Sequence, residues 1–236
     1  MAVGDKGGLN LNYCIFKDID SRELGLYMER CPEKVSPKRR DEIFTVPGRH
    51  GNLTTTDGAF ETYIKSAEFV VTDMTRIDEI SAHFKGSGWL TFSNEPDRRY
   101  KARVANQIEF SHIIKTLKRF AVEFEVQPFS YDIFSQPLIK TEPFKIFNIG
   151  TFNSEPIITV FGSGNITLKV NGQNVYLTGI TDRITIDSEM QNAYRGTASM
   201  NNRMRGEFPI LSIGQNDITW TGNVTKLEIQ PNWRWV

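Results

Sequence analysis

The amino-acid sequence predicts a mainly β protein of two domains. Apolar residues of SEPIITVFGSGNITLKVNG (154–172) alternate at the period of two that is typical of strands, and Asn171-Gly172 is a strong hairpin signal. Only one segment, residues 73–84, has the apolar spacing of a helix. Pro128 and Pro137 separate a mixed first part from a second part of short strands. We therefore expect an N-terminal β-rich domain with one α-helix, followed by a β-sandwich.

The N-terminal domain, residues 1–135, is expected to place its strands around that helix. The expected strands are residues 9–16, 60–71, 89–92, 99–108 and 117–126. Apolar side chains one or two turns apart give the helix a buried face, at Ile77, Ile80 and Phe84. Asp73 or Thr75 can cap its start, and Gly86 and Gly88 end it.

Residues 30–58 form a long polar connection in this domain. Prolines and glycines interrupt it at Pro32, Pro37, Pro47, Gly48, Gly51 and Gly58. Connections of this length are usually functional. The basic run Lys38-Arg39-Arg40 is followed at once by Asp41-Glu42, so the local field is largely cancelled and a solvated loop is favoured over a nucleic-acid contact.

The C-terminal domain, residues 136–236, contains only short strands and turns. The expected strands are residues 138–146, 156–161, 165–170, 174–178, 183–186, 208–213, 216–221 and 224–230. This spacing is typical of a sandwich or jelly roll. Residues 157–161 read as a strand buried on both faces, Gly162 to Asn165 as a turn, and residues 166–170 as a strand with one wet face.

Composition indicates a folded chain without a strongly charged partner. Of 236 residues, 39% are hydrophobic and 11% aromatic, which argues against disorder. Lys+Arg and Asp+Glu both total 28, and residues 1–140 carry 20 of each sign, so neither half has the basic excess of a nucleic-acid or anionic-membrane binder. We expect neither a transmembrane helix nor a signal peptide, because no long apolar run is present and MAVGDKGGLNLN lacks an apolar core.

No catalytic, metal or cofactor site is expected. His50, His83 and His112 lack metal-ligand spacing, and so do Cys14 and Cys31, which could form a disulfide but are expected to be free thiols in a cytosolic chain. Three further groups resemble reactive sites only superficially. They are the acidic group Asp182, Asp187 and Glu189, read as a turn plus a solvated strand edge; Ser163, which lacks a GxSxG frame; and Gly4 to Gly8, which lacks a preceding strand.

Three tryptophans allow two interpretations. Trp220, Trp233 and Trp235 could stack against sugar rings, or they could pack in the sandwich. Trp220 lies in an alternating strand, and Trp233 and Trp235 alternate with Arg234 in a closing strand. Burial is therefore the favoured interpretation.

Several motifs then occur together in one order. They are VPGRHGNLTTTDGAFE (46–61), the lone helix, WLTF (89–92), SNEPDRRYKARV (93–104), FEVQPFSY (124–131), SEPIITVFGSG (154–164), ITIDSEMQNAY (184–194), GEFPILSIGQNDITWTG (206–222) and the terminal IQPNWRWV. Together they resemble the distal tail protein (Dit) family of long-tailed phages and prophages of Gram-positive bacteria. The resemblance covers nearly the whole chain.

The resemblance implies a non-enzymatic hub that forms a hexameric ring at the end of the tail tube. It implies an N-terminal ring-forming domain and a galectin-like C-terminal sandwich. The implied partners are further copies of the chain, the tail tube protein, the tail-associated tip protein and, as an open question, receptor-binding proteins. The implied location is the virion tail tip, after assembly in the host cytoplasm.

Ring closure requires one patch to meet a different patch on the next copy. We place one such patch in residues 30–58, with Arg49 and His50 near the contact and Lys38, Arg39 and Arg40 as further candidates. The alternative function is a carbohydrate-binding adhesin module that recognises the host cell wall. The HxNPR-type strand of galectins is absent, which weighs against that alternative. A cell-wall hydrolase is disfavoured, because no plausible acid/base pair is in view.

Overall fold

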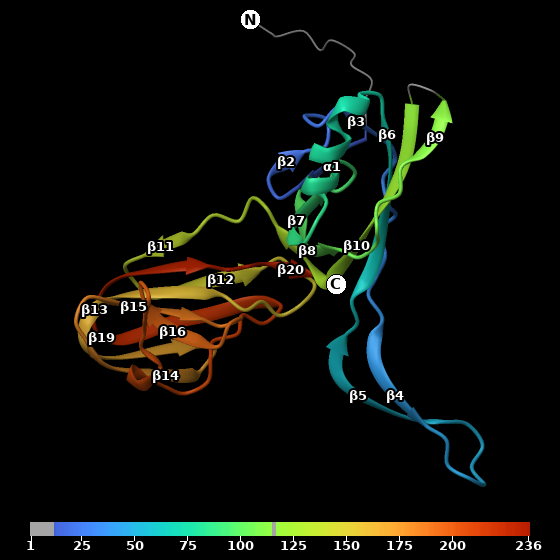
Figure 1. The fold of residues 1–236 in the computed structure, drawn as a ribbon. Helices are drawn as coiled ribbons and strands as arrows, with labels where there is room; N and C mark the ends of the chain where they lie inside the picture. The colour runs from blue at the N-terminus through green and yellow to red at the C-terminus, as the bar shows by residue number, and fades with distance from the viewer. Residues whose placement is uncertain (1–11, 115–116) are drawn as a thin grey trace, which may run out of the picture. The chain divides into compact units, whose positions relative to one another are not determined.

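The computed structural model describes residues 12–114 and 117–236 and confirms a mainly β chain (Figure 1). The chain divides into two compact units, unit 1 ending at Ser130 and unit 2 covering Tyr131–Val236. The division falls a few residues before the boundary expected at 135/136, and independent folding of the two parts stays a prediction.

Unit 1 is built on one antiparallel sheet. Its strands follow the order β2 (Ile19–Asp20), β1 (Cys14–Phe16), β7 (Ser87–Phe92), β8 (Arg98–Val104), β10 (Leu117–Asp132), β6 (Tyr63–Val71) and β3 (Leu26–Arg30), and β9 (Ser111–Ile114) pairs with β10. Alternate residues of β10 are buried, as predicted: Phe120, Val122, Phe124 and Val126. The strand predicted at 99–108 was too long, since β8 ends at Val104. Of the strand predicted at 9–16, residues 9–11 lie outside the described residues, and β1 begins only at Cys14.

The predicted helix covers the buried face of this sheet. A 3-10 turn, η1 (Met74–Arg76), leads into α1 (Ile77–His83), and the side chain of Asp73 accepts a hydrogen bond from the Thr75 amide, 3.0 Å away. Ile80 and Phe84 are buried in the unit 1 core. The ring of Phe84 lies 5.5 Å from that of Phe69 and 6.1 Å from that of Phe124. The helix ends at His83, ahead of Gly86.

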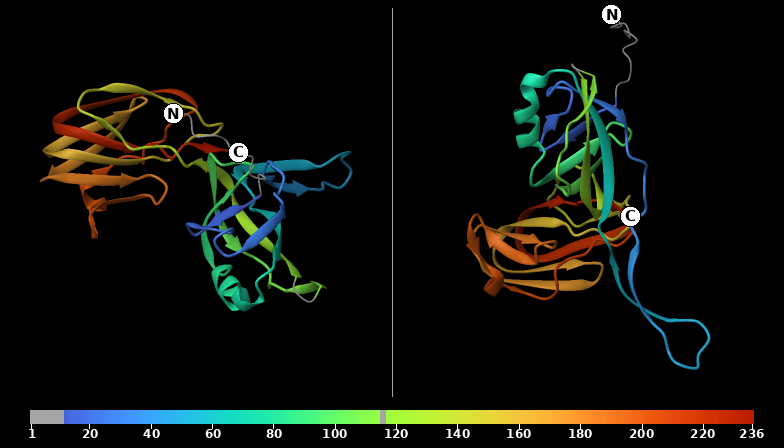
Figure 2. Two further views of the ribbon diagram at one scale, coloured as in Figure 1. Left: turned by 90° about the horizontal axis from the view of Figure 1, so that it is seen from above. Right: turned by 45° about the vertical axis from the view of Figure 1, so that its right-hand side comes forward.

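The connection predicted at residues 30–58 is not irregular. It contains β4 (Arg39–Phe44) and β5 (Leu53–Phe60), which, among the described residues, pair only with each other. We call this hairpin, residues 39–60, the arm. In Figures 1 and 2 the arm continues from β6 and leaves the sheet of unit 1. The prediction missed these strands because both faces of each are exposed, so the apolar alternation that marks a half-buried strand is absent.

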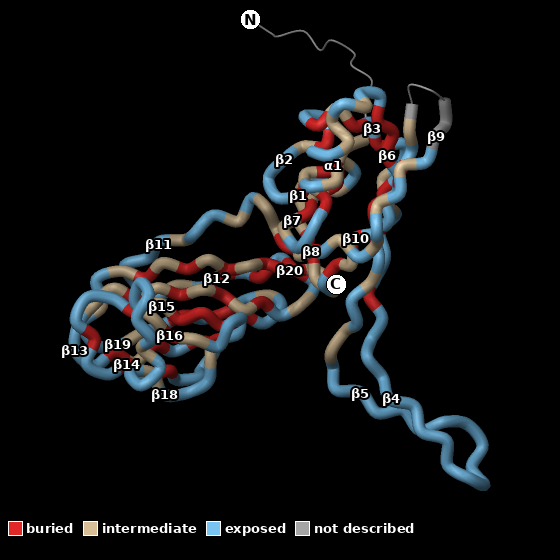
Figure 3. Tube along the Cα trace, in the orientation of Figure 1, coloured by how far each residue is buried: buried red, intermediate tan, exposed pale blue. Residues whose placement is uncertain are grey.

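Unit 2 is a β-sandwich whose two longest strands pass through both layers. Its strands are β11 (Leu138–Lys140), β12 (Phe144–Asn148), β13 (Ile157–Val170), β14 (Gln173–Ile180), β15 (Arg183–Asp187), β16 (Asn192–Arg195), β17 (Ala198–Ser199), β18 (Met204–Arg205) and β19 (Gly214–Gln230), with the 3-10 turn η2 (Asn201–Arg203). β20 (Arg234–Trp235) follows but pairs with none of these strands. The first half of β13 pairs with β15, and the second half pairs with β14. Side chains from both halves, such as Val160 and Leu168, share one core, which Figure 3 shows in red.

Glycines lie where the paired strands β13 and β19 shift register and approach closely. The predicted turn at Gly162 to Asn165 is a register shift inside β13, and the expected strands 216–221 and 224–230 are parts of β19. A Cβ on Gly162 would overlap the carbonyl oxygen of Asn223, so the two backbones cross too closely for any side chain. Gly222 has φ +101 and faces the carbonyl of Asn165. Strands that switch layers commonly do so at such bulges.

Other details of unit 2 follow the sequence more closely. Asn171 and Gly172 have φ of 51° and 86° and close the hairpin between β13 and β14, as predicted. Residues 166–170 have the predicted wet face, whereas residues 157–161 are fully buried on one face only. The strand expected at 208–213 is limited to one bridge, between Leu211 and Ser154.

Candidate assembly interface

The arm is exposed along its length up to Gly58. Every residue from Lys38 to Gly58 is exposed, including the apolar side chains of Ile43 (63%), Phe44 (48%) and Leu53 (45%). An isolated two-stranded hairpin is marginally stable in water, because it has no face to bury. The arm therefore has the properties of a segment that another surface covers.

Hydrogen bonds and ring contacts hold the base of the arm, where β4 begins and β5 ends. The guanidinium of Arg40 binds the carboxylate of Asp57 across the two strands, with Nε 2.9 Å from Oδ2. The amide of Ala59 donates to the same carboxylate, and together with Arg40 it lowers the pKa of Asp57. Arg39 lies over the ring of Phe60, which in turn meets Phe129 edge-on at 5.9 Å.

The sequence-predicted interface residues lie at two places on the arm. Arg49 and His50 are at its tip, where the Arg49 amide donates to the Val46 carbonyl at 3.1 Å. Gly48 and Gly51 flank them with φ of 82° and 80°, a conformation that favours glycine. Lys38, Arg39 and Arg40 are at the base, so the structure does not bring the five residues together.

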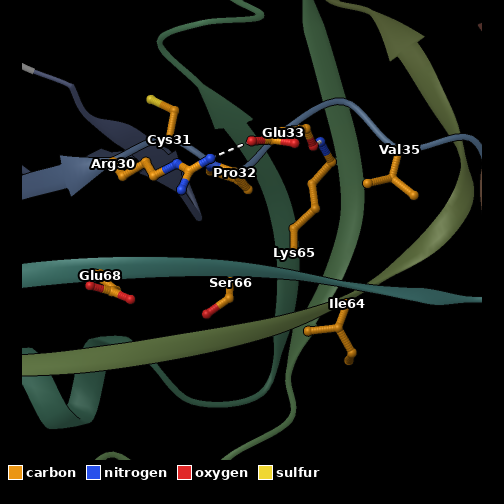
Figure 4. A pocket seen from close by; sticks show the side chains of 9 residues that line it. All are labelled: Arg30, Cys31, Pro32, Glu33, Val35, Ile64, Lys65, Ser66 and Glu68. Carbon is orange, nitrogen blue, oxygen red and sulfur yellow. Dashed lines mark hydrogen bonds and ion pairs between the residues drawn. The ribbon is translucent and has the colours of Figure 1, made fainter.

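A groove lies beside the base of the arm, between residues 30–35 and β6. Figure 4 shows its lining, which is Arg30, Cys31, Pro32, Glu33, Val35, Ile64, Lys65, Ser66 and Glu68. Its volume is about 310 Å³. Lys65 points toward Glu33, while Ile64 and Ser66 lie on the opposite side of the strand (Figure 4). No pattern in the sequence indicates this groove.

A buried charge network supports one wall of the groove. Lys65 is 1% exposed, and its Nζ lies 3.2 Å from the Glu95 carboxylate and 3.3 Å from the carbonyl oxygen of Glu33. The hydroxyl of Tyr100 donates to the same Glu95 oxygen at 2.8 Å. Burial lowers the pKa of Lys65, and Glu95 opposes that shift. Burial also raises the pKa of Tyr100, with the bonded Glu95 carboxylate adding to the effect. In the sequence, the one sign of this network is Lys65, a charged residue among the apolar residues of β6.

Three other polar residues singled out in the sequence, His83, Asp187 and Ser163, lie in packed or hydrogen-bonded positions. His83 packs against the rings of Phe16 and Phe84. The side chain of Asp187 accepts a hydrogen bond from the Met190 amide. Asp187 is buried, so it does not lie on the solvated strand edge that was predicted. Ser163 accepts a hydrogen bond from Asn223. The side chain of His112 and residues 4–8 lie outside what the structure describes.

Of the three tryptophans, only Trp233 is fully buried. Trp220 and Trp235 are half-buried against the unit 2 core. The predicted alternation around Arg234 is wrong, because Arg234 is also buried, with Nη1 2.8 Å from the Glu155 carboxylate. The Arg234 side chain is thus buried in an ion pair with Glu155, and the strand does not alternate between buried and exposed residues there.

The described part of the chain holds no group of three His, Cys, Asp or Glu side chains that could bind a metal ion. Cys14 and Cys31 are free thiols. None of the helices within residues 12–114 and 117–236 is long and apolar enough to cross a membrane.

The chain is similar to a solved structure over nearly its full length. It is the crystal structure of the SPP1 Dit protein (gp 19.1), described as a paradigm of the hub adsorption apparatus in phages that infect Gram-positive bacteria. The TM-score is 0.74 at 13% sequence identity, over 93% of this chain and 98% of that chain. The chain has the Dit fold. No family model and no curated protein matches the sequence.

The motifs singled out in the sequence lie at defined places in this fold. Residues 46–61 form the tip and second strand of the arm, and WLTF with the segment after it forms the β7–β8 hairpin. Residues 154–164 and 206–222 include the crossing of β13 and β19 in unit 2. The motifs therefore fall on the arm, on the β7–β8 hairpin and at the strand crossing of unit 2.

Proposed function

We propose that this protein is a structural hub of a phage tail tip. The observation that carries the proposal is the match to the SPP1 Dit protein across both units. In this proposal the chain forms a homo-oligomeric ring, six copies by analogy with the Dit family, that joins the tail tube to the host-adsorption apparatus. The protein acts by assembly and not by catalysis, within the virion tail, after assembly in the host cytoplasm.

The exposed arm supports the ring-forming role of unit 1. Burying its apolar side chains against another copy would contribute on the order of 1 kcal/mol for each. The arm of one copy and the surface that receives it are different patches, which is the requirement for a head-to-tail ring. Unit 2 is proposed as the outer domain, available to tail proteins or receptor-binding proteins.

The mass of the purified protein in solution tests the proposal. Light scattering should give six times the 27.0 kDa mass of one chain, or a twelve-chain double ring. A monomer that binds wall polysaccharide would instead support the adhesin function. A monomer that stays monomeric when tail tube and tip proteins are added would contradict the hub.

Substitution of Arg49 tests the contribution of the arm tip. Arg49 can hold a carboxylate with two parallel hydrogen bonds, so Arg49→Glu should weaken ring formation while the monomer stays folded. Arg205→Glu, at an exposed arginine of β18 in unit 2, is the matched control and should leave assembly unchanged. Full rings of the Arg49→Glu variant at the wild-type concentration would show that the tip makes no contact.

A further inference from the structure

A second groove lies in unit 2, over β15, β16 and β17, on the side of these strands that points away from the core. Its volume is about 330 Å³, and its lining is Asp187, Met190, Asn192, Tyr194, Gly196, Thr197 and Ser199. Strand pairing places Asp187 opposite Asn192, and Tyr194 opposite Ser199. Ala193 points into the core, so its two neighbours, Asn192 and Tyr194, point outward together. We call this the polar groove.

Asp187 is the unusual member of the lining, because its carboxylate is buried without a cation. The residue is 8% exposed, and its Oδ1 accepts a hydrogen bond from the Met190 amide at 3.0 Å. Within the described residues, no Lys, Arg or His forms an ion pair with Asp187, and its side chain makes no second hydrogen bond. Buried charges are normally paired, since burial without a partner is costly. Oδ2 is therefore able to accept a hydrogen bond from a ligand.

The other polar side chains of the groove are also available. Those of Asn192, Tyr194, Thr197 and Ser199 make no hydrogen bond with any residue that the structure describes. Together they present an amide, a phenol and two aliphatic hydroxyls, which can both donate and accept. In the groove beside the arm, by contrast, ion pairs already engage most of the charged side chains. The polar groove thus has the greater unused capacity for hydrogen bonds.

The chemistry of the lining limits the ligand. The lining carries one carboxylate and no Lys, Arg or His, so it disfavours phosphate groups and acidic peptides. Its apolar surface is confined to the half-buried ring of Tyr194 and the exposed side chain of Met190, which is too little for a hydrocarbon chain. A neutral sugar has an apolar ring face and hydroxyl groups at its edge. These match one aromatic ring surrounded by a carboxylate, an amide and hydroxyls.

We propose that the polar groove binds a neutral sugar unit of a polysaccharide. The inference goes beyond the proposed hub function and does not depend on it. The Tyr194 ring packs against the sugar ring, and Asp187 and Asn192 bind its hydroxyl groups. None of the three tryptophans considered in the sequence lines this groove. The groove is open and buries few groups, so we expect a dissociation constant on the order of 1 mM.

Saturation-transfer NMR of the full chain tests the assignment, because it detects weak binding through the signals of the ligand. The probes are neutral methyl glycosides of glucose, galactose and N-acetylglucosamine. We expect at least one to bind, and its signal to disappear in Tyr194→Ala and in Ser199→Arg, which fills the groove from an exposed position. Asp187→Asn keeps an acceptor for the Met190 amide and loses the charged acceptor, so binding should weaken at least about tenfold. Tyr176→Ala, at an exposed tyrosine of β14, is the matched control and should bind as the wild type does.

The pattern of signals separates the outcomes. Absence of binding by all three glycosides would overturn the polar groove as a sugar site. Binding that persists in Ser199→Arg would place the sugar elsewhere, and binding of protonated glucosamine alone would show a site for a cation. A ring that binds no sugar loses only the polar groove. A sugar-binding chain that stays monomeric with its tail partners keeps the polar groove and contradicts the hub function.

Discussion

The ammonium group of Lys65 is buried beside aromatic rings, and the carboxylate of Glu95 compensates its charge. Its ammonium also lies 4.7 Å from the ring centre of Tyr100. Removing one member of a buried ion pair leaves the other charge uncompensated, which typically costs about 3–5 kcal/mol. We expect Lys65→Met to lower the stability of unit 1 by that amount, measured by calorimetry as a shift of the unit 1 transition.

The double variant Lys65→Met with Glu95→Gln is the control for this prediction. Glutamine keeps an acceptor for the Tyr100 hydroxyl and removes the uncompensated charge, so most of the lost stability should return. If the double variant is as unstable as the single one, the role of Lys65 is packing and not charge.

His83 gives unit 1 a pH dependence of known sign. Burial lowers its pKa, the nearby Lys17 cation lowers it further, and Glu79 opposes both effects. The unfolded chain therefore takes up this proton near pH 6.5, before the folded chain does. Between that pH and the lower folded pKa, stability should fall as pH falls. His83→Gln should flatten this part of the stability–pH curve; an unchanged slope would assign it to other groups.

At the scale of elements, the crossing of β13 and β19 makes a sharp prediction. Gly162→Ala places a methyl group against the Asn223 backbone, whereas Gly164→Ala has nothing within 4 Å and meets only the strain of φ +79. The Gly164 variant should lose about 1–2 kcal/mol, the cost of a left-handed residue. The Gly162 variant should lose more, as measured by urea unfolding of unit 2. Equal losses would mean that the two strands can separate at the crossing.

Sequence patterns predicted the elements that have one buried and one wet face. The alternation in β10, the apolar face of α1 and the Asn171-Gly172 hairpin are all present. Gly162 and Gly222 were misread because a glycine at a backbone crossing looks like a glycine in a turn. The distinction depends on how close a distant strand lies, which local sequence does not contain.

The sequence predicted only part of the candidate interface. Proline and glycine content drew attention to residues 30–58, and Gly48 and Gly51 do turn the chain at the tip. The strands of the arm gave no signal, since a fully exposed hairpin has no polar and apolar faces to alternate. The groove combines residues 30–35 with β6, two segments that only the folded sheet brings together.

At the scale of the whole molecule, the balance of charge limits what can hold a ring together. The chain carries 28 charges of each sign, so long-range attraction between copies is weak. Apolar burial and matched local charges must then supply the free energy of assembly. The exposed apolar residues of the arm, such as Ile43, Phe44 and Leu53, are suited to this.

The oligomer should therefore survive a large increase in ionic strength. A stable interface buries on the order of 1,200–2,000 Å². Salt barely affects apolar contacts, and it screens buried ion pairs much less than exposed ones. Sedimentation at about 0.1 M and about 1 M salt spans Debye lengths of roughly 10 to 3 Å. We expect the same oligomer in both. Dissociation at the higher salt would mean that exposed pairs, such as those available to Arg49 at the arm tip, hold the ring, and that the apolar side chains of the arm stay in water.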